Sequence, residues 1–251
     1  MQRYLCKLVV CVAVLVASIG QVHAAVIGIG NGQYYTNTLE NNLVAQGHTV
    51  NVVGSYTPEV LSAFDVYIQD GNSFFDATYL DTFVFNGGTL IELPWSQTQK
   101  RLTANTVVIG PREVPEVGVS NPAITVLDSG SFLLDGVTLP SAGDYTISRE
   151  FGNVFVAGNP VLEWADSTAL LGYREYGAGR VVSFNLHLIT SDANPLNAPW
   201  SNQIVYNAVN GPSVAPVPEP TSLAVFTIGG CVAGLGAARR RRCEKQQVAT
   251  A

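Results

Sequence analysis

Cysteine is absent from most of this 251-residue chain. Its four cysteines lie near the two ends: Cys6 and Cys11 come before residue 25, and Cys231 and Cys243 come after residue 216. The region between them therefore has no disulfide, no thiolate metal site and no cysteine nucleophile. A domain of about 190 residues is large enough to be stable through its hydrophobic core alone.

Basic residues are scarce in the same region. Seven of the 13 lie near the two ends of the chain, which leaves six basic residues against 17 of the 19 acidic ones. Residues 25–216 thus have a formal net charge of about −11. Because so acidic a surface repels a phosphate backbone, nucleic acid is not expected as a partner.

The first 24 residues have the three parts of a secretory signal peptide. Two basic residues precede an apolar run at residues 8–20, and Val22 and Ala24 are small residues at the −3 and −1 positions of a cut before Ala25. A transmembrane anchor is the alternative, but the run is short and no stop-transfer charges follow it. The pattern predicts export and removal of residues 1–24.

A second apolar run lies near the C-terminus, between a short proline motif and a block of arginines. The parts are the motif Val217, Pro218, Glu219 and Pro220, the run at residues 221–238, and the block Arg239, Arg240, Arg241 and Arg242. A helix over the 18 residues of this run spans about 27 Å, close to the thickness of a bilayer's hydrocarbon core. The arginines would hold its end in the cytoplasm by the positive-inside rule.

In its parts and their order, the segment 217–242 resembles the PEP-CTERM sorting signal of Gram-negative bacteria. The resemblance implies export across the inner membrane, anchoring of the precursor by the transmembrane helix, and an exosortase-type membrane protease as a partner. Cleavage near Pro218 would release or transfer the domain to the cell surface, often alongside exopolysaccharide. A permanent single-pass anchor is the alternative. Residues 212–216 are then a linker and residues 243–251 a cytoplasmic stub.

The central region alternates short apolar runs with segments of helical spacing. We expect strands at residues 26–29, 48–53, 66–69 and 89–93, and helices at residues 37–46, 58–63 and 77–86. Gly47 follows the first helix and Gly87 the third, in the position where glycine ends a helix. Strands that alternate with helices through short loops predict a mostly parallel sheet with helices on both faces.

The pattern is less regular after Pro94. Residues 102–153 are rich in proline, glycine, serine and valine, and we interpret them as a β-rich insertion. Regular elements then return: an antiparallel strand pair at residues 161–165 and 169–176, a strand at 180–186 and a final helix at 200–209.

Five segments in a fixed order carry a second resemblance. They read NTLENNLVAQGHTVNVV, FDVYIQDG, FVFNGGTLIELPW, LLGYREYGAGRVVSFNLHL and NQIVYNAVN. Together they resemble the class I glutamine amidotransferase-like superfold, near its trehalose-utilisation (ThuA-like) relatives. The resemblance implies that residues 25–211 form a flavodoxin-like three-layer α/β sandwich.

The chain lacks part of the set of residues that amidotransferases use for catalysis. Members that catalyse it have a cysteine on the turn after a central strand, whereas this turn reads Leu-Pro-Trp-Ser and ends at Ser96. His187 matches the family's strand-end histidine, but Leu188 and Ile189 replace the Pro-Glu that should follow. A base without its nucleophile and its orienting acid does not run acyl transfer, and no G-x-S-x-G elbow surrounds Ser96. We therefore assign no catalytic residue.

Two further patterns suggest ligands only at first sight. Glycines recur within residues 28–32, but a dinucleotide site would need a further glycine where Gln33 stands and an acidic residue after the second strand. Neither is present, so a tight turn is the better interpretation. Asp70, Asn72 and Asp76 fail the EF-hand spacing, and a turn followed by a helix N-cap at Asp76 is the alternative to a looser oxygen site. We predict no cofactor and no metal.

Polar and aromatic residues nevertheless follow several expected strands. The candidate ligand-binding residues are Asn31, Asp70, Glu92, Trp95 and His187. Because ligands of open α/β sheets bind beyond the carboxyl ends of the strands, these residues should converge. Hydrogen-bonding groups beside an aromatic ring suit a sugar. Each residue also has a structural interpretation, as packing for Trp95 and as a partly buried histidine for His187.

The sequence thus favours an exported, non-catalytic domain with a binding or structural role at the cell surface, with extracellular polysaccharide as a partner. The alternative is a carbohydrate-active hydrolase in which Glu92 and Asp70 act with His187, as paired carboxyls do in glycosidases. Two carboxyl groups about 5–9.5 Å apart in an open cleft would favour the hydrolase.

Overall fold

The computed structural model describes residues 24–30, 37–69, 76–94, 103–110, 116–120, 122–143, 147–186 and 199–211. The chain divides into two units, Met1–Val214 and Ala215–Ala251, and every described residue belongs to the first. The predicted sorting segment and all but the last residue of the predicted signal peptide lie outside these ranges. Within the ranges, helices are too short or too polar to cross a bilayer.

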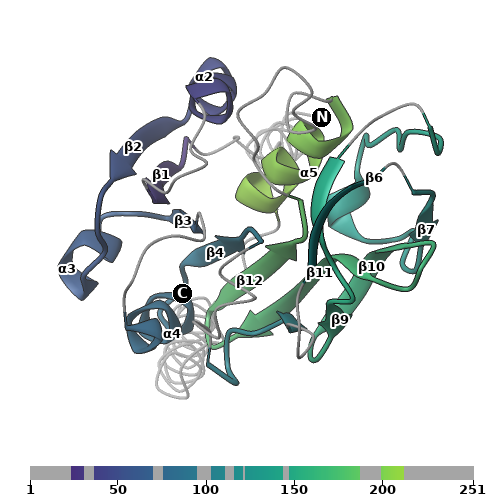
Figure 1. The fold of residues 1–251 in the computed structure, drawn as a ribbon. Helices are drawn as coiled ribbons and strands as arrows, with labels where there is room; N and C mark the ends of the chain where they lie inside the picture. The colour runs from purple at the N-terminus through teal and green to yellow at the C-terminus, as the bar shows by residue number, and fades with distance from the viewer. Residues whose placement is uncertain are drawn as a thin grey trace, which may run out of the picture. The chain divides into compact units, whose positions relative to one another are not determined.

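An eight-stranded mixed sheet forms the centre of the domain (Figure 1). Its order is β2 (Thr49–Val53), β1 (Val26–Gly30), β3 (Val66–Gln69), β4 (Thr89–Glu92), β12 (Gly179–Phe184), β11 (Ala169–Tyr176), β10 (Asn159–Trp164) and β7 (Ile124–Val126). The first five strands are parallel to one another, and the last three pair antiparallel. The order of the parallel strands fits a flavodoxin-like fold and confirms the predicted α/β class.

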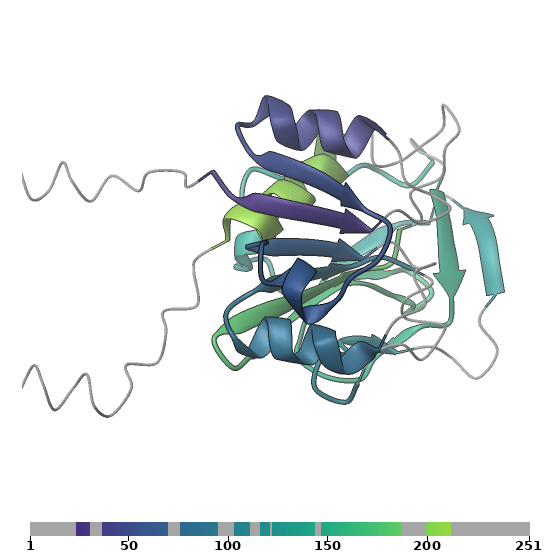
Figure 2. The same cartoon turned by 90° about the vertical axis from the view of Figure 1, so that its left-hand side faces the viewer.

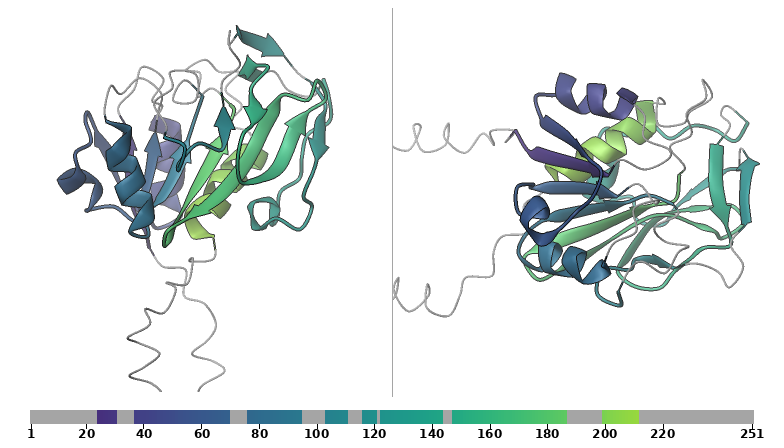
Figure 3. Two further views of the ribbon diagram at one scale, coloured as in Figure 1. Left: turned by 90° about the horizontal axis from the view of Figure 1, so that it is seen from below. Right: turned by 60° about the vertical axis from the view of Figure 1, so that its left-hand side comes forward.

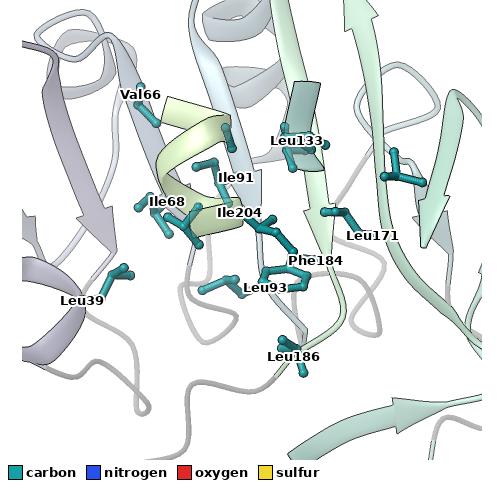
Figure 4. Packing of buried hydrophobic residues seen from close by; sticks show 14 of the residues in the cluster. Leu39, Val66, Ile68, Ile91, Leu93, Leu133, Leu171, Phe184, Leu186 and Ile204 are labelled. Atoms are coloured by element: carbon teal, nitrogen blue, oxygen red, sulfur yellow. The ribbon is translucent and has the colours of Figure 1, made fainter. Parts of the chain in front are cut away.

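Helices cover both faces of the parallel part of the sheet (Figure 2). Helices α2 (Asn37–Ala45) and α5 (Pro199–Asn210) lie on one face, where their residues share a core cluster with Ile68 and Ile91 of the sheet (Figure 4). Helices α3 (Pro58–Leu61) and α4 (Ala77–Phe85) lie on the other face and share a second cluster with Tyr67 of the sheet. Alternate residues of each strand therefore enter opposite clusters, as the period of a strand requires.

The helix ends follow the signals in the sequence. Gly47 after α2 and Gly87 after α4 have φ angles of +92° and +111°, a left-handed conformation that glycine adopts without strain. Asp76 precedes α4, and its Oδ1 accepts a hydrogen bond from Thr78 N at 3.0 Å. This contact confirms the N-cap interpretation of Asp76 and holds the pKa of its carboxyl below the usual value.

The region predicted as an insertion is β-rich, but it is not separate from the sheet. Its strand β7 pairs with β10 and forms one edge of the main sheet, which the sequence did not predict. The short 3₁₀ helix η1 (Phe132–Leu134) packs beside α5. Strand β5 (Ile109–Gly110) pairs with β9 (Val154–Phe155), outside the main sheet.

Strands β6 (Glu116–Ser120) and β8 (Ile147–Phe151) form a separate two-stranded ribbon. Arg149 of β8 is buried, and its Nη1 and Nη2 donate to Asp166 at 3.1 and 2.7 Å. Its guanidinium also stacks on Phe151 and Trp164. These contacts fix the ribbon to the turn between β10 and β11, and Figures 2 and 3 show it beyond the carboxyl ends of the parallel strands.

Candidate functional site

The carboxyl ends of four strands meet at one edge of the sheet. Strands β1, β3, β4 and β12 are parallel neighbours in that order, so the segments that follow them begin side by side. The predicted ligand residues Asn31, Asp70, Trp95 and His187 follow these strands but lie outside the described residues. Their convergence stays a prediction, and Glu92 is the one candidate whose surroundings are described.

Glu92 is the last residue of β4 and is fully buried. Ser183 of β12 donates a hydrogen bond from Oγ to Glu92 Oε2. Burial raises the pKa of Glu92 to about 8, although the bond from Ser183 acts in the opposite direction. Glu92 is therefore a neutral carboxylic acid at pH 7, with a hydroxyl donor as well as an acceptor.

Gln69 completes a row of three buried polar side chains. It ends β3 and lies opposite Glu92, which in turn lies opposite Ser183. None of the three side chains is exposed. The row lies on the α4 face of the sheet, because residues two positions earlier, Tyr67 and Leu90, belong to the cluster of that face.

Part of this row has unused hydrogen-bonding capacity. Within the described residues, Gln69 Nε2, Gln69 Oε1 and Glu92 Oε1 are buried and have no hydrogen-bond partner. Each such buried polar group costs about 1–3 kcal/mol relative to a satisfied one. A carboxyl and a carboxamide side by side can both donate and accept, so the row is suited to holding water or another neutral polar group.

The segment Thr103–Gly110 helps to cover this face and is tied to α4 through Asp81. Asp81 Oδ1 accepts from Thr103 Oγ1 at 2.5 Å and from Thr106 Oγ1 at 3.1 Å, and its Oδ2 accepts from Asn105 Nδ2 at 3.1 Å. Val108 and Ile109 then enter the same core cluster as Tyr67. Two buried apolar residues, Val108 and Ile109, and the carboxylate of Asp81 thus hold this segment on the α4 face.

Sequence reasoning identified Glu92 but missed Gln69 and Ser183. The sequence did contain a sign of them, because Gln69 and Ser183 are polar residues near the ends of the apolar strands β3 and β12. It indicates a shared polar site only once the register of the sheet is known, since the register places the two residues on either side of Glu92.

A groove of about 330 Å³ lies elsewhere, between α3 and α4. Its lining includes Asp65, Gly87 and Gly88, which precede β3 and β4, so it opens at the amino edge of the sheet and away from Glu92. Among the described residues, no three His, Cys, Asp or Glu side chains gather as metal ligands.

Comparison with known proteins identifies the C-terminal tail. Residues 216–242 match the PEP-CTERM protein-sorting motif, which confirms the interpretation of residues 217–242. A motif of this kind implies an exported, membrane-anchored precursor that an exosortase processes. Among curated protein sequences, none matches the chain.

Solved structures are similar to the domain in fold. The cytoplasmic protein STM3548 of Salmonella typhimurium has a TM-score of 0.57 at 13% identity, over 74% of this chain and 97% of that one. The cytoplasmic protein STM1381 of Salmonella typhimurium LT2 has a TM-score of 0.53 at 13% identity, over 73% and 97%. A putative ThuA-like protein of Bacteroides uniformis has a TM-score of 0.48 at 10% identity, over 76% and 92%. At these identities the likeness concerns the fold alone.

Proposed function

We propose that this protein is sorted to the surface of a Gram-negative bacterium, where its α/β domain has a non-catalytic binding or structural role. The PEP-CTERM motif at residues 216–242 carries the proposal, because it follows the domain in the sequence and a motif of this kind is typical of tails that an exosortase processes. The mature protein then consists of the domain, without its leader and without the arginine block.

The burial of Glu92 supports a role without catalysis. A glycosidase needs two carboxyl groups that reach the substrate from an open cleft. Glu92 is instead fully buried, neutral at pH 7 and bonded to Ser183. The hydrolase alternative, in which Glu92 and Asp70 act with His187, therefore has no support from the surroundings of Glu92.

A neutral polysaccharide is the ligand class that the domain suits best. Asn31, Asp70, Trp95 and His187 follow neighbouring parallel strands, which supports their convergence at the carboxyl edge. An indole ring with amide, carboxylate and imidazole groups around it offers stacking and hydrogen bonds to sugar hydroxyls. The acidic surface disfavours anionic ligands.

Two measurements on protein recovered from the native host test this proposal. The intact mass should lack residues 1–24 and 239–251, and the recovered protein should bind the host's exopolysaccharide without shortening it. Surface protein that still carries Arg239 would refute processing and leave a plain membrane anchor. Release of sugar fragments that stops in Glu92→Gln would refute the non-catalytic role.

A further inference from the structure

His48 lies where the two ends of the described domain meet. It directly precedes β2 and is only 4% exposed. Its Nδ1 accepts a hydrogen bond from Ala25 N at 3.2 Å, and Ala25 is only 7% exposed. Ala25 is also the residue before which the predicted signal peptide ends.

The other side of the His48 ring faces α5. Its Nε2 lies 3.4 Å from the side-chain amide of Asn210, the last residue of the helix, and its ring centroid lies 6.1 Å from that of Tyr206. A neutral histidine that accepts at Nδ1 carries its proton on Nε2. Because Asn210 Nδ2 is also a donor, its 3.4 Å approach to Nε2 is then a packing contact and not a hydrogen bond. His48 therefore joins the start of β1 to the end of the helix that leads to the sorting tail.

We propose that His48 is the binding site of the mature N-terminus, and that Nδ1 accepts a hydrogen bond from the α-ammonium group that removal of the leader creates on Ala25. The proposal rests on the predicted cut but not on any ligand of the domain. Hydrolysis of the bond between Ala24 and Ala25 consumes one water and leaves a carboxylate on Ala24 and an amino group on Ala25. The nitrogen that already contacts His48 thereby gains a positive charge.

The change strengthens an existing contact. A hydrogen bond from a charged donor is roughly twice as strong as one between neutral groups. His48 is able to accept it because burial lowers the pKa of its imidazole and keeps the ring neutral. Asp65 Oδ2 accepts from Val26 N, next to Ala25 in the sequence, at 2.8 Å, and this carboxylate favours a cation there. From α5, the side chains of Tyr206 and Asn210 face the ring.

The exposure of the neighbouring residues agrees with this role. Ala24 is exposed whereas Ala25 is buried, so the new ammonium group forms at the boundary between the domain and the solvent. Two of its protons can face water while the third points to His48. Leader removal thus reinforces the attachment of β1 to His48, whose ring lies against Tyr206 of α5.

Titration of His48 in the mature protein provides the first test. Loss of His23 with the leader leaves two histidines, His48 and His187, so their imidazole signals can be assigned by NMR with the variant His187→Gln. The N-terminus is then acetylated near neutral pH, where an α-amine reacts and lysine is largely protonated. We expect a lower pKa for His48 with the free amine than with the acetylated one. The same pKa in both forms would overturn the proposal.

Thermal unfolding gives a second, independent readout. Acetylation should lower the melting temperature of the wild type at pH 7 and leave that of His48→Ala unchanged, because the variant has no acceptor for the ammonium group. An equal decrease in both proteins would show that the amine is stabilised by other groups. If His48→Ala does not fold, the NMR titration alone decides. An N-terminus at a residue other than Ala25 would reject this proposal and leave the sorting of the tail intact.

Discussion

Gln69 and Glu92 lie directly opposite each other on parallel strands β3 and β4, and neither side chain reaches solvent. Atoms of both lack a hydrogen-bond partner within the described residues. Parallel strands at the centre of an α/β sheet are usually apolar, since both of their faces are covered. A polar pair at this place therefore lowers the stability of the domain unless water, a ligand or another part of the chain satisfies its hydrogen bonds.

Replacement of Glu92 by glutamine should remove a pH dependence of stability. Because the pKa of Glu92 is raised from 4.5 to about 8, the folded state keeps a proton that the unfolded state loses, and stability falls as the pH rises from 4.5 through 8. One pKa unit corresponds to about 1.4 kcal/mol. We expect Glu92→Gln to be more stable than the wild type by on the order of 5 kcal/mol at pH 9 and equal to it at pH 4, since the pKa differs by about 3.5 units between the two states.

Urea unfolding at pH 4, 7 and 9 measures this difference. Glu163→Gln, at a half-buried position on strand β10 of the same sheet, is the matched control for loss of a carboxyl group. A constant difference between Glu92→Gln and the wild type over the whole range would show that Glu92 does not titrate as a buried acid.

Substitution of Asp81 should loosen the cover of the α4 face. Asp81→Ala removes three hydrogen bonds to the segment Thr103–Gly110 and leaves Thr106 buried without that acceptor. We expect a loss of about 2 kcal/mol in the free energy of unfolding, measured with urea. Asp135→Ala, at an exposed position, should change stability by less than about 0.5 kcal/mol. Equal stability of the two variants would contradict the bridging role of Asp81.

Redox conditions should not affect the mature domain. Residues 25–216 contain no cysteine, so no disulfide contributes to their stability. The melting temperature of the mature protein should be the same with and without reductant. A decrease of several degrees on reduction would mean that a cysteine outside this region is retained and bridged.

Trp95 is the residue whose loss should most affect sugar binding. Stacking of an indole on a sugar ring contributes on the order of 1 kcal/mol, so Trp95→Ala should bind the host's exopolysaccharide about five-fold more weakly. Binding is measured with and without calcium. Phe85→Ala is the control, since Phe85 is an exposed aromatic residue that ends α4 at the amino edge of the sheet. Equal affinity of the two variants would reject the carboxyl edge as the binding site.

Local patterns in the sequence predicted most elements of the parallel half. Apolar runs, glycine stops and the Asp76 cap lie within single elements, and the strand β3 has the predicted bounds. The antiparallel pair of β10 and β11 was also predicted, because a short turn joins the two strands. The tail was predicted because its three parts are adjacent in the sequence.

Non-local contacts were beyond the reach of the sequence. Strand β7 pairs with β10 and places Val126 opposite Leu162, and the spacing of apolar residues within a strand does not indicate which distant strand it pairs with. The same holds for Gln69 and Ser183, whose proximity to Glu92 depends on the register of three strands. His48 looked unremarkable in the sequence, because its partners Ala25 and Asn210 come from opposite ends of the domain.

The course of α5 links the two edges of the sheet. The helix begins after β12, which ends at the carboxyl edge, and finishes beside His48 at the amino edge. Its buried side chains Trp200, Ile204 and Ala208 share one core cluster with the sheet, so detachment of the helix would expose all three together. Local opening of α5 is therefore costly, and its amide hydrogens should exchange with solvent about as slowly as those of the central strands.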